Sequence, residues 1–122
     1  MSRLEYFSNP DVPIFATHGV NDKLPKELMS FMLDIVFHQA NVLRILGEEV
    51  DYFQCLEIER KSNGFKIILP ENGIYERHSY FLEYTGDKRY SGKVYFIESW
   101  NGKTVDVELD DHYITILLPE EY

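Results

Sequence analysis

CLEIERKSNGFKIIL, residues 55–69, is the segment that reveals most about how this chain folds. Leu56 and Ile58 alternate with acidic residues, and Phe65, Ile67 and Leu69 repeat the same period of two. The Lys-Ser-Asn-Gly sequence between the two runs is typical of a tight turn. In a paired sheet, this alternation places all five apolar side chains on one face. The segment therefore predicts an antiparallel hairpin with a shared apolar side.

The rest of the second half has the same texture. Runs of β-branched and aromatic residues are separated by single glycines or Asn-Gly pairs, at intervals short enough for antiparallel hairpins. Further strands are predicted over residues 80–84, 94–97, 105–109 and 113–118, with a short edge strand over 14–17. Together with a helix described next, the pattern predicts an α+β fold: one long helix packed on a curved antiparallel sheet of about five to seven strands.

The helix is predicted from its start and stop signals. Asn21-Asp22 would begin it, Pro25 lies in its first turn and Gly47 stands just past its end, which gives a length of about 20 residues. Apolar residues cover most of its circumference, so it should be buried on more than one side. A narrow polar strip is formed by Glu27, Ser30, Asp34, His38 and Asn41.

Length and composition indicate one folded domain over residues 1–122. The chain has 122 residues, 44% hydrophobic and 15% aromatic, which is too rich for a disordered chain. No apolar run approaches the roughly 20 residues that span a bilayer, and the first residues lack the apolar stretch of a signal peptide. We therefore expect a cytoplasmic protein.

The sequence lacks recognisable motifs for catalysis or metal binding. Cys55 is the single cysteine, which excludes an intramolecular disulfide, and its strand-like surroundings predict a buried small hydrophobe. Asp34 with His38, and residues 110–112, contain metal-ligand types, but a solvated helix face and a loop account for them. Neither a Gly-rich phosphate loop nor a Gly-x-Ser-x-Gly elbow is present. A non-enzymatic protein without a cofactor or metal is expected.

Acidic residues outnumber basic ones by twenty-one to twelve, a net charge of -9, and the imbalance grows toward the C-terminus. Residues 81–122 alone hold nine acids and four bases. A field of this sign repels phosphate backbones, so we expect no direct nucleic-acid binding and, as partner, a basic protein. The candidate protein-binding residues are Asp106, Glu108, Asp110, Asp111, Glu98 and Trp100.

Two interpretations of this acidic surface stay open. On the predicted strand 105–109, the period of two places Asp106 and Glu108 together on the solvent side. Such a face can simply keep the protein soluble. Alternatively, it can imitate the spaced negative charge of nucleic acid and occupy the basic groove of a nuclease or regulator, and then binding should weaken as salt rises.

Nine tyrosines accompany the acids, and tyrosine is enriched at the cores of protein interfaces. The candidates are Tyr80, Tyr84, Tyr90, Tyr95 and, beside them, Trp100. Most are expected to be ordinary cross-strand packing residues. A platform for stacking RNA bases needs Lys and Arg around the rings, and the surroundings here are acidic, so that function is rejected.

Three stretches carry a resemblance to a known family: FATHGVN (residues 15–21), DYFQCLEI (51–58) and LLPEEY (117–122). Together they resemble a small family from Gram-positive bacteria, the staphylococcal protein of unknown function (domain of unknown function 960). The resemblance spans residues 15–122, with less agreement between Asn63 and Val105. Its members are shorter, so the segment around Trp100 looks like an added hairpin. The resemblance implies no catalytic residue and no cofactor.

Members of that family are often met on phages, plasmids and conjugative elements, whose genes often encode inhibitors of host defence. Joined to the acidic charge, this setting predicts a non-enzymatic inhibitor of a nucleic-acid-processing defence protein, such as a CRISPR nuclease or a restriction enzyme. A housekeeping or regulatory protein-interaction module is the alternative, and a small enzyme with an unrecognised site is the second. An exposed strand edge would also allow a symmetric homodimer.

Overall fold

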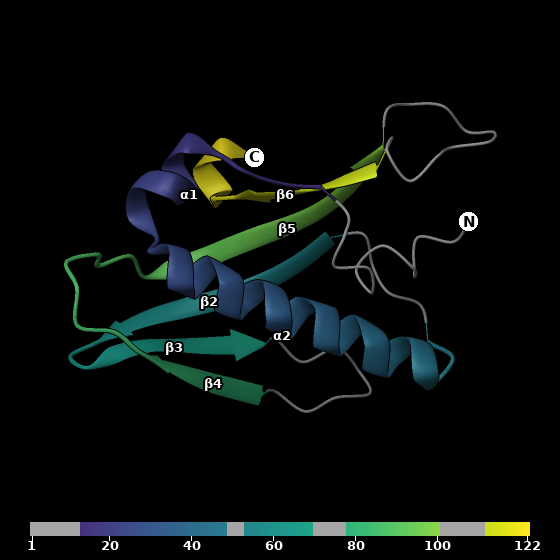
Figure 1. Ribbon diagram of the computed structural model, residues 1–122, viewed down its shortest axis with the longest axis horizontal. Coiled ribbons are helices and arrows are strands. Elements are labelled where there is room, and N and C mark those ends of the chain that lie inside the picture. The colour runs from purple at the N-terminus through teal and green to yellow at the C-terminus, as the bar shows by residue number, and fades with distance from the viewer. Residues whose placement is uncertain (1–12, 49–52, 70–77, 101–111) are drawn as a thin grey trace.

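The structure, a computed structural model, describes residues 13–48, 53–69, 78–100 and 112–122 (Figure 1). The strands are β1 (Ile14–Ala16), β2 (Phe53–Lys61), β3 (Gly64–Leu69), β4 (His78–Glu83), β5 (Gly92–Trp100) and β6 (His112–Leu117). The helices are α1 (His18–Lys23), α2 (Lys26–Ile45) and the short 3-10 turn η3 (Pro119–Glu121). The predicted α+β class is confirmed, whereas the predicted strand 105–109 lies outside the described residues.

All six strands belong to one sheet, in the order β1-β6-β5-β2-β3-β4. The predicted edge position of the first strand is confirmed, but the wholly antiparallel sheet is wrong, because β1 runs parallel to β6. Parallel and antiparallel strands share the side-chain period of two, so alternation alone could not distinguish them. The predicted curvature of the sheet stays a prediction.

The hairpin formed by β2 and β3 is confirmed. Lys61 pairs with Gly64 across the two-residue turn, and Ile58 pairs with Ile67 farther along the ladder. Leu56, Ile58, Phe65, Ile67 and Leu69, the five apolar residues of the predicted shared side, are all buried. Gly64 is needed here for space, because a Cβ on it would lie 2.2 Å from the carbonyl oxygen of Leu82 in β4.

We expect Gly64→Ala to destabilise the fold by about 1–3 kcal/mol, the usual effect of forcing a methyl group into an occupied space. The obstacle is main chain, so a side-chain rotation cannot relieve it. Urea unfolding followed by circular dichroism would measure the change. Gly47→Ala is a useful contrast: a Cβ there meets no atom within 4 Å, so its cost comes from the positive φ of 78° alone. Equal stability of Gly64→Ala and the parent chain would contradict the close approach of Gly64 to β4.

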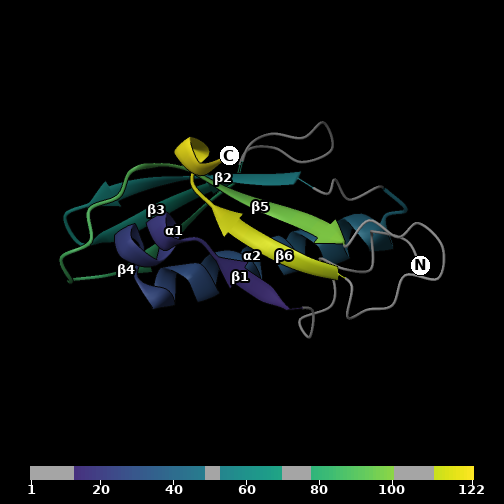
Figure 2. The ribbon, with the colours of Figure 1, turned by 90° about the horizontal axis from the view of Figure 1, so that it is seen from above.

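Helix α2 lies across one side of the sheet, and the C-terminal turn lies on the other side (Figure 2). The buried side of α2 joins the sheet's apolar residues in one core. It is formed by Leu28, Met32, Ile35, Val36, Ala40 and Leu43. In the predicted polar strip, Asn41 is half-buried and the other four residues are exposed, so the orientation is confirmed. Gly47 follows the helix with a φ of 78°, as its stop signal predicted.

The predicted start of the long helix is wrong. Asn21 and Asp22 lie inside the separate short helix α1, whose first turn is capped by the hydroxyl of Thr17, 3.4 Å from the main-chain nitrogen of Val20. Leu24 and Pro25 are buried between the two helices, and α2 begins only at Lys26. Proline favours the start of a helix, so Pro25 was the more reliable signal of the two.

The connection from β4 to β5 joins two strands that are not neighbours in the sheet. Residues 84–91 carry the chain from edge strand β4, past the ends of β3 and β2, to β5 on the far side of β2. Arg60, near the end of β2, holds this connection. Its guanidinium donates to the carbonyl oxygens of Lys88 (2.9 Å) and Gly86 (3.3 Å), as well as to those of Gly64 (2.9 Å) and Lys61. It also lies 5.0 Å from the ring centre of Phe65 and 5.1 Å from that of Tyr84.

Arg60→Lys should destabilise the fold by about 1.5–3 kcal/mol, because an ammonium cannot reach several carbonyl oxygens at once and stacks less well on the rings. The matched control is Lys61→Ala on the next residue, whose ion pair with Glu59 (3.0 Å) is exposed on both sides. That substitution should change stability by no more than about 0.5 kcal/mol. Chemical denaturation of both variants tests the contrast, and equal effects would contradict the role of Arg60.

Candidate functional site

The predicted acidic surface attaches to the described structure at one end of two strands. The chain leaves at Trp100, the last residue of β5, and returns at His112, the first residue of β6, and these two residues are register partners. Asp106, Glu108, Asp110 and Asp111 lie between them and outside the described residues, so their shared solvent face stays a prediction. Of the added hairpin predicted around Trp100, only Trp100 is described, at the end of β5, and the residues that follow it lie outside the described part.

Glu98 was predicted as part of this acidic surface, and there the prediction is wrong. Its side chain is only 2% exposed, so it cannot offer a carboxylate to a partner. The period of two in β5 puts Glu98 on the same side as Val94 and Phe96, which are both in the core. Counting that period from the predicted strand 94–97 would have revealed the inward position.

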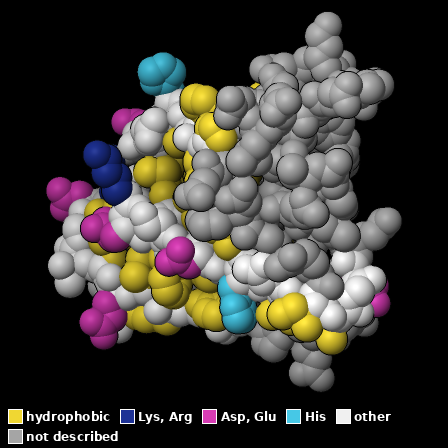
Figure 3. All heavy atoms as spheres, turned by 45° about the vertical axis from the view of Figure 1, so that its right-hand side comes forward, with side chains coloured by type: hydrophobic (Ala, Val, Ile, Leu, Met, Phe, Trp, Pro, Cys, Tyr) yellow, Lys and Arg dark blue, Asp and Glu magenta, His cyan; other side chains and the backbone are white. Residues whose placement is uncertain are grey.

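The remaining acids of the described part do not gather into one patch on the visible side. On the face shown in Figure 3, Asp and Glu side chains stand apart from one another, and hydrophobic side chains are visible between them. Separate acids of this kind fit a solvated surface. No acidic patch on this face replaces the one predicted at residues 106–111, which stays a prediction.

The sheet face away from α2 carries a series of aromatic side chains. Phe15 of β1 and Tyr113 of β6 meet edge to face, with ring centres 5.7 Å apart. Phe53 of β2, Tyr95 of β5 and Tyr122 form a second group, with centres 4.8–5.8 Å apart. Phe15 is 57% exposed and Tyr122 is 73% exposed. Such rings supply contact area for a protein partner at low entropic cost.

Only one of the predicted interface tyrosines belongs to this aromatic face. Tyr95 lies on it, whereas Tyr80, Tyr84 and Tyr90 pack against the core. Sequence reasoning missed Phe15, Phe53, Tyr113 and Tyr122. A signal for Tyr113 was available, because it alternates with Ile114 and Ile116 and must therefore face away from the core.

The C-terminal turn is tied to the start of α1 through Glu121. One carboxylate oxygen accepts hydrogen bonds from the hydroxyl of Thr17 (2.5 Å) and the main-chain nitrogen of Leu118 (3.1 Å). The other accepts from the main-chain nitrogen of Gly19 (3.1 Å), and Lys23 of α1 pairs with Glu120 at 3.0 Å. Residues from all three stretches of the family resemblance therefore meet here, since Phe53 lies against Tyr122.

The hydrogen bond from Thr17 is the largest cause that lowers the pKa of Glu121 below its ordinary value of 4.5, followed by the one from the Leu118 nitrogen. A lowered folded-state pKa means that the charged form is bound more tightly in the folded chain. The contribution to stability is therefore complete above about pH 4.5 and is lost as pH falls through the lowered value.

Glu121→Gln tests this linkage. The variant should unfold at a lower temperature than the parent near pH 7. This difference in unfolding temperature should narrow as pH falls below about 4.5 through the lowered pKa, where the parent loses the same contribution. Thermal melts followed by circular dichroism across this range would show it. Glu48→Gln, at an exposed position past the end of α2, is the control. It should change neither the unfolding temperature nor its dependence on pH. A gap between parent and Glu121→Gln that is constant over the range would contradict the role given to the charge.

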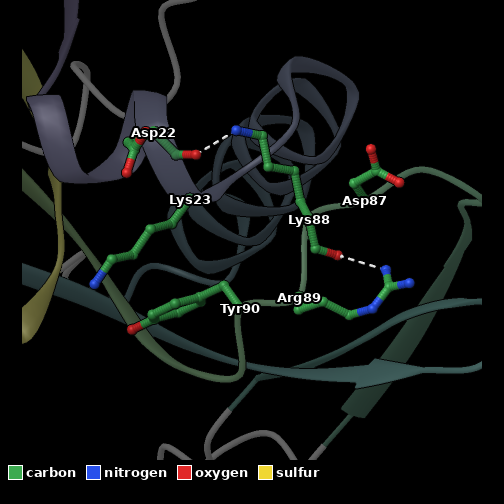
Figure 4. Close-up of a pocket in the computed structure, with 6 residues that line it drawn as sticks. All are labelled: Asp22, Lys23, Asp87, Lys88, Arg89 and Tyr90. Atoms are coloured by element: carbon green, nitrogen blue, oxygen red, sulfur yellow. Dashed lines mark hydrogen bonds between the residues drawn. The ribbon is translucent and has the colours of Figure 1, made fainter.

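A hollow of about 290 Å³ lies between the end of α1 and the 84–91 connection. It is lined by Asp22, Lys23, Asp87, Lys88, Arg89 and Tyr90 (Figure 4). The ends of the three basic side chains point in different directions: Lys88 donates to the carbonyl oxygen of Asp22, and Arg89 donates to that of Lys88 (3.3 Å). Two acids lie among these cations, and the basic groups do not point toward one position. They therefore do not form an anion-binding pocket.

The described residues offer little else for metal binding or nucleophilic catalysis. Within the described ranges, no cluster of three or more His, Cys, Asp and Glu side chains could hold a metal ion. Cys55 is half-buried on the aromatic side of the sheet, not fully buried as predicted. Burial is the largest cause that raises the pKa of its thiol, which disfavours the thiolate that a nucleophile needs. No helix of the described part is long and apolar enough to cross a membrane.

A search of solved structures found a match over the whole fold. A protein of unknown function from Enterococcus faecalis aligns with a TM-score of 0.64 and 18% identity, covering 100% of this chain and 97% of that one. No protein-family model and no curated protein matches the chain. At this identity the likeness shows the fold alone, and the resemblance to the staphylococcal family stays a prediction.

Proposed function

We propose that this protein is a non-enzymatic, acidic protein-binding domain that inhibits a nucleic-acid-processing defence protein. The observation that carries the proposal is the net charge of -9, concentrated in the C-terminal third. A nuclease or a regulator must present a basic groove to its nucleic acid, and an acidic surface of similar charge spacing can occupy that groove. A cytoplasmic inhibitor from a phage or another mobile element, acting against CRISPR or restriction, would fit this role.

The described structure supports the proposal by placing exposed aromatic rings beside the attachment of the acidic segment. Asp111 is joined directly to β6, and Tyr113, two residues farther on, meets the exposed ring of Phe15. Binding surfaces commonly combine charges, which speed association, with a few aromatic side chains that carry most of the binding energy. The acids would guide a basic partner, and the Phe15–Tyr113 pair would become buried on contact.

Capture from a bacterial lysate tests the charge. The tagged protein is incubated at about 50 mM and about 500 mM salt, and bound proteins are identified by mass. A nuclease or another nucleic-acid-binding protein should be recovered at low salt and lost at high salt, because screening weakens pairing between exposed charges. The variant with Asp106→Asn, Glu108→Gln, Asp110→Asn and Asp111→Asn should lose that protein at both salt concentrations.

The control variant removes the same amount of charge elsewhere, at four exposed acids: Glu27→Gln, Asp34→Asn, Glu48→Gln and Asp87→Asn. It should keep the partner under the proposal, because its acids at 106–111 are intact although its net charge is identical to that of the first variant. Equal loss from both variants would reduce the effect to bulk charge. Unchanged binding after neutralisation of residues 106–111, or a partner indifferent to salt, would overturn the mimic and favour a housekeeping or regulatory module. A catalytic activity that persists after neutralisation of the acids at 106–111 would favour a small enzyme.

A further inference from the structure

Strand β4 forms one edge of the sheet, and its hydrogen-bonding pattern can be worked out from the register. The main-chain nitrogen of Tyr84 bonds to the carbonyl oxygen of Asn63 at 3.1 Å, directly beyond the pair of Glu83 with Gly64. In an antiparallel ladder, hydrogen-bonded and non-hydrogen-bonded pairs alternate. Leu82, Tyr80 and His78 therefore bond to β3, and the N–H and C=O groups of Ser79, Phe81 and Glu83 point outward.

This edge lacks the features that usually prevent strand pairing. The opposite edge, β1, has only three residues and follows Pro13, whereas β4 has six residues without lysine or proline. Short strands, lysines and prolines are the common means of blocking an edge. In addition, the ring of Phe81 is 45% exposed. Among the described residues no strand pairs with this edge of β4, so its ladder and the half-exposed ring of Phe81 offer a surface for another strand.

We propose that β4 pairs antiparallel with β4 of a second copy of this chain, with the two-fold axis at Phe81. In this register the two Phe81 residues face each other, and each Ser79 faces Glu83 of the other copy. All three outward-pointing residues then lie opposite outward-pointing residues, and each such pair exchanges two main-chain hydrogen bonds. A shift by two residues leaves one of them outside the ladder or sets Phe81 against Glu83.

The side chains of β4 are complementary to themselves in the central register. The Phe81 rings meet on the open side of the sheet, and Tyr80 comes beside Leu82 on the helix side, where both already pack against the core. The hydroxyl of Ser79 can donate to the carboxylate of Glu83, so the two like charges stay apart instead of facing each other. Glu83 is the only Asp, Glu, Lys or Arg in the strand, so local repulsion between copies is small.

The partner's charge distinguishes this dimer from the inhibitor complex. Each copy carries a net charge of -9, so screening should strengthen self-association, whereas it should weaken binding to a basic protein. The dimer requires neither the acids at 106–111 nor a foreign partner. Failure of the proposed function would therefore leave it untouched.

Analytical ultracentrifugation over a range of protein concentrations tests the dimer and its register. The parent chain should dimerise more tightly at about 500 mM salt than at about 50 mM. Ser79→Glu places two carboxylates opposite each other in both symmetry-related pairs and should weaken dimerisation about tenfold at low salt. Ser79→Lys should strengthen it by a similar factor, because each pair becomes oppositely charged. Asp34→Asn on the exposed strip of α2 changes the net charge by the same amount as Ser79→Lys and is its control; it should show only the general effect of net charge.

Phe81→Lys is a second disruption that acts through the edge itself, and circular dichroism would verify that each variant remains folded. A chain that stays monomeric at every concentration and salt would overturn the proposal. A dimer that responds equally to Ser79→Glu and Ser79→Lys would do the same, because the register requires opposite signs. Protection of β4 from hydrogen exchange only in the presence of a different protein would assign the edge to that protein instead.

Discussion

The guanidinium of Arg60 is the interaction on which the order of the strands depends. Strands β2, β3 and β4 follow one another in sequence and in space, but β5 must return past two strand ends to lie beside β2. Within the described ranges, no strand pairs with the returning segment, residues 84–91. Arg60 holds this segment by binding its carbonyl oxygens, and the hydroxyl of Ser91 accepts the main-chain N–H of Arg60 at 2.9 Å, where β5 is about to begin. Because β6 pairs with β5 and β1 with β6, the position of β5 determines where β5, β6 and β1 lie, which is half of the sheet.

Local patterns were sufficient for several features in which neighbours in sequence are neighbours in space. The hairpin 55–69, the end of α2 and its polar strip all follow from side-chain periods of two and 3.6 and from turn or stop residues such as Gly47, whereas the predicted start of the helix was wrong. The sequence could also have separated the two faces of the sheet at Tyr113 and Glu98, since the parity of each position is fixed by its buried neighbours. Residue type alone suggested an exposed Glu98 and gave no role to Tyr113, whereas their positions in the strands determine which face each one occupies.

The remaining features depend on contacts between distant parts of the chain. The parallel pairing of β1 with β6 joins residues about a hundred positions apart, and no short-range signal encodes a strand's direction against such a partner. The bonds of Glu121 with Thr17 and Gly19 span a similar separation. In the sequence, Arg60 is an ordinary charged residue near a predicted turn. Its role depends on the 84–91 connection, whose carbonyl oxygens it binds only in the folded chain. Side chains of this kind acquire their role only from tertiary structure.

The two ends of β5 differ in the charged residues associated with them. At the beginning of β5 lie Lys93 and, around the neighbouring end of β2, Arg60, Lys61, Lys88 and Arg89, interspersed with the acids Glu59, Asp22 and Asp87. At the other end the chain continues from Trp100 into the residues that carry Asp106, Glu108, Asp110 and Asp111. Edge strand β4 lies two strands away from β5, across β2 and β3. Pairing there would leave the ends of β5 free, so a dimer could present two acidic segments to its partners at once.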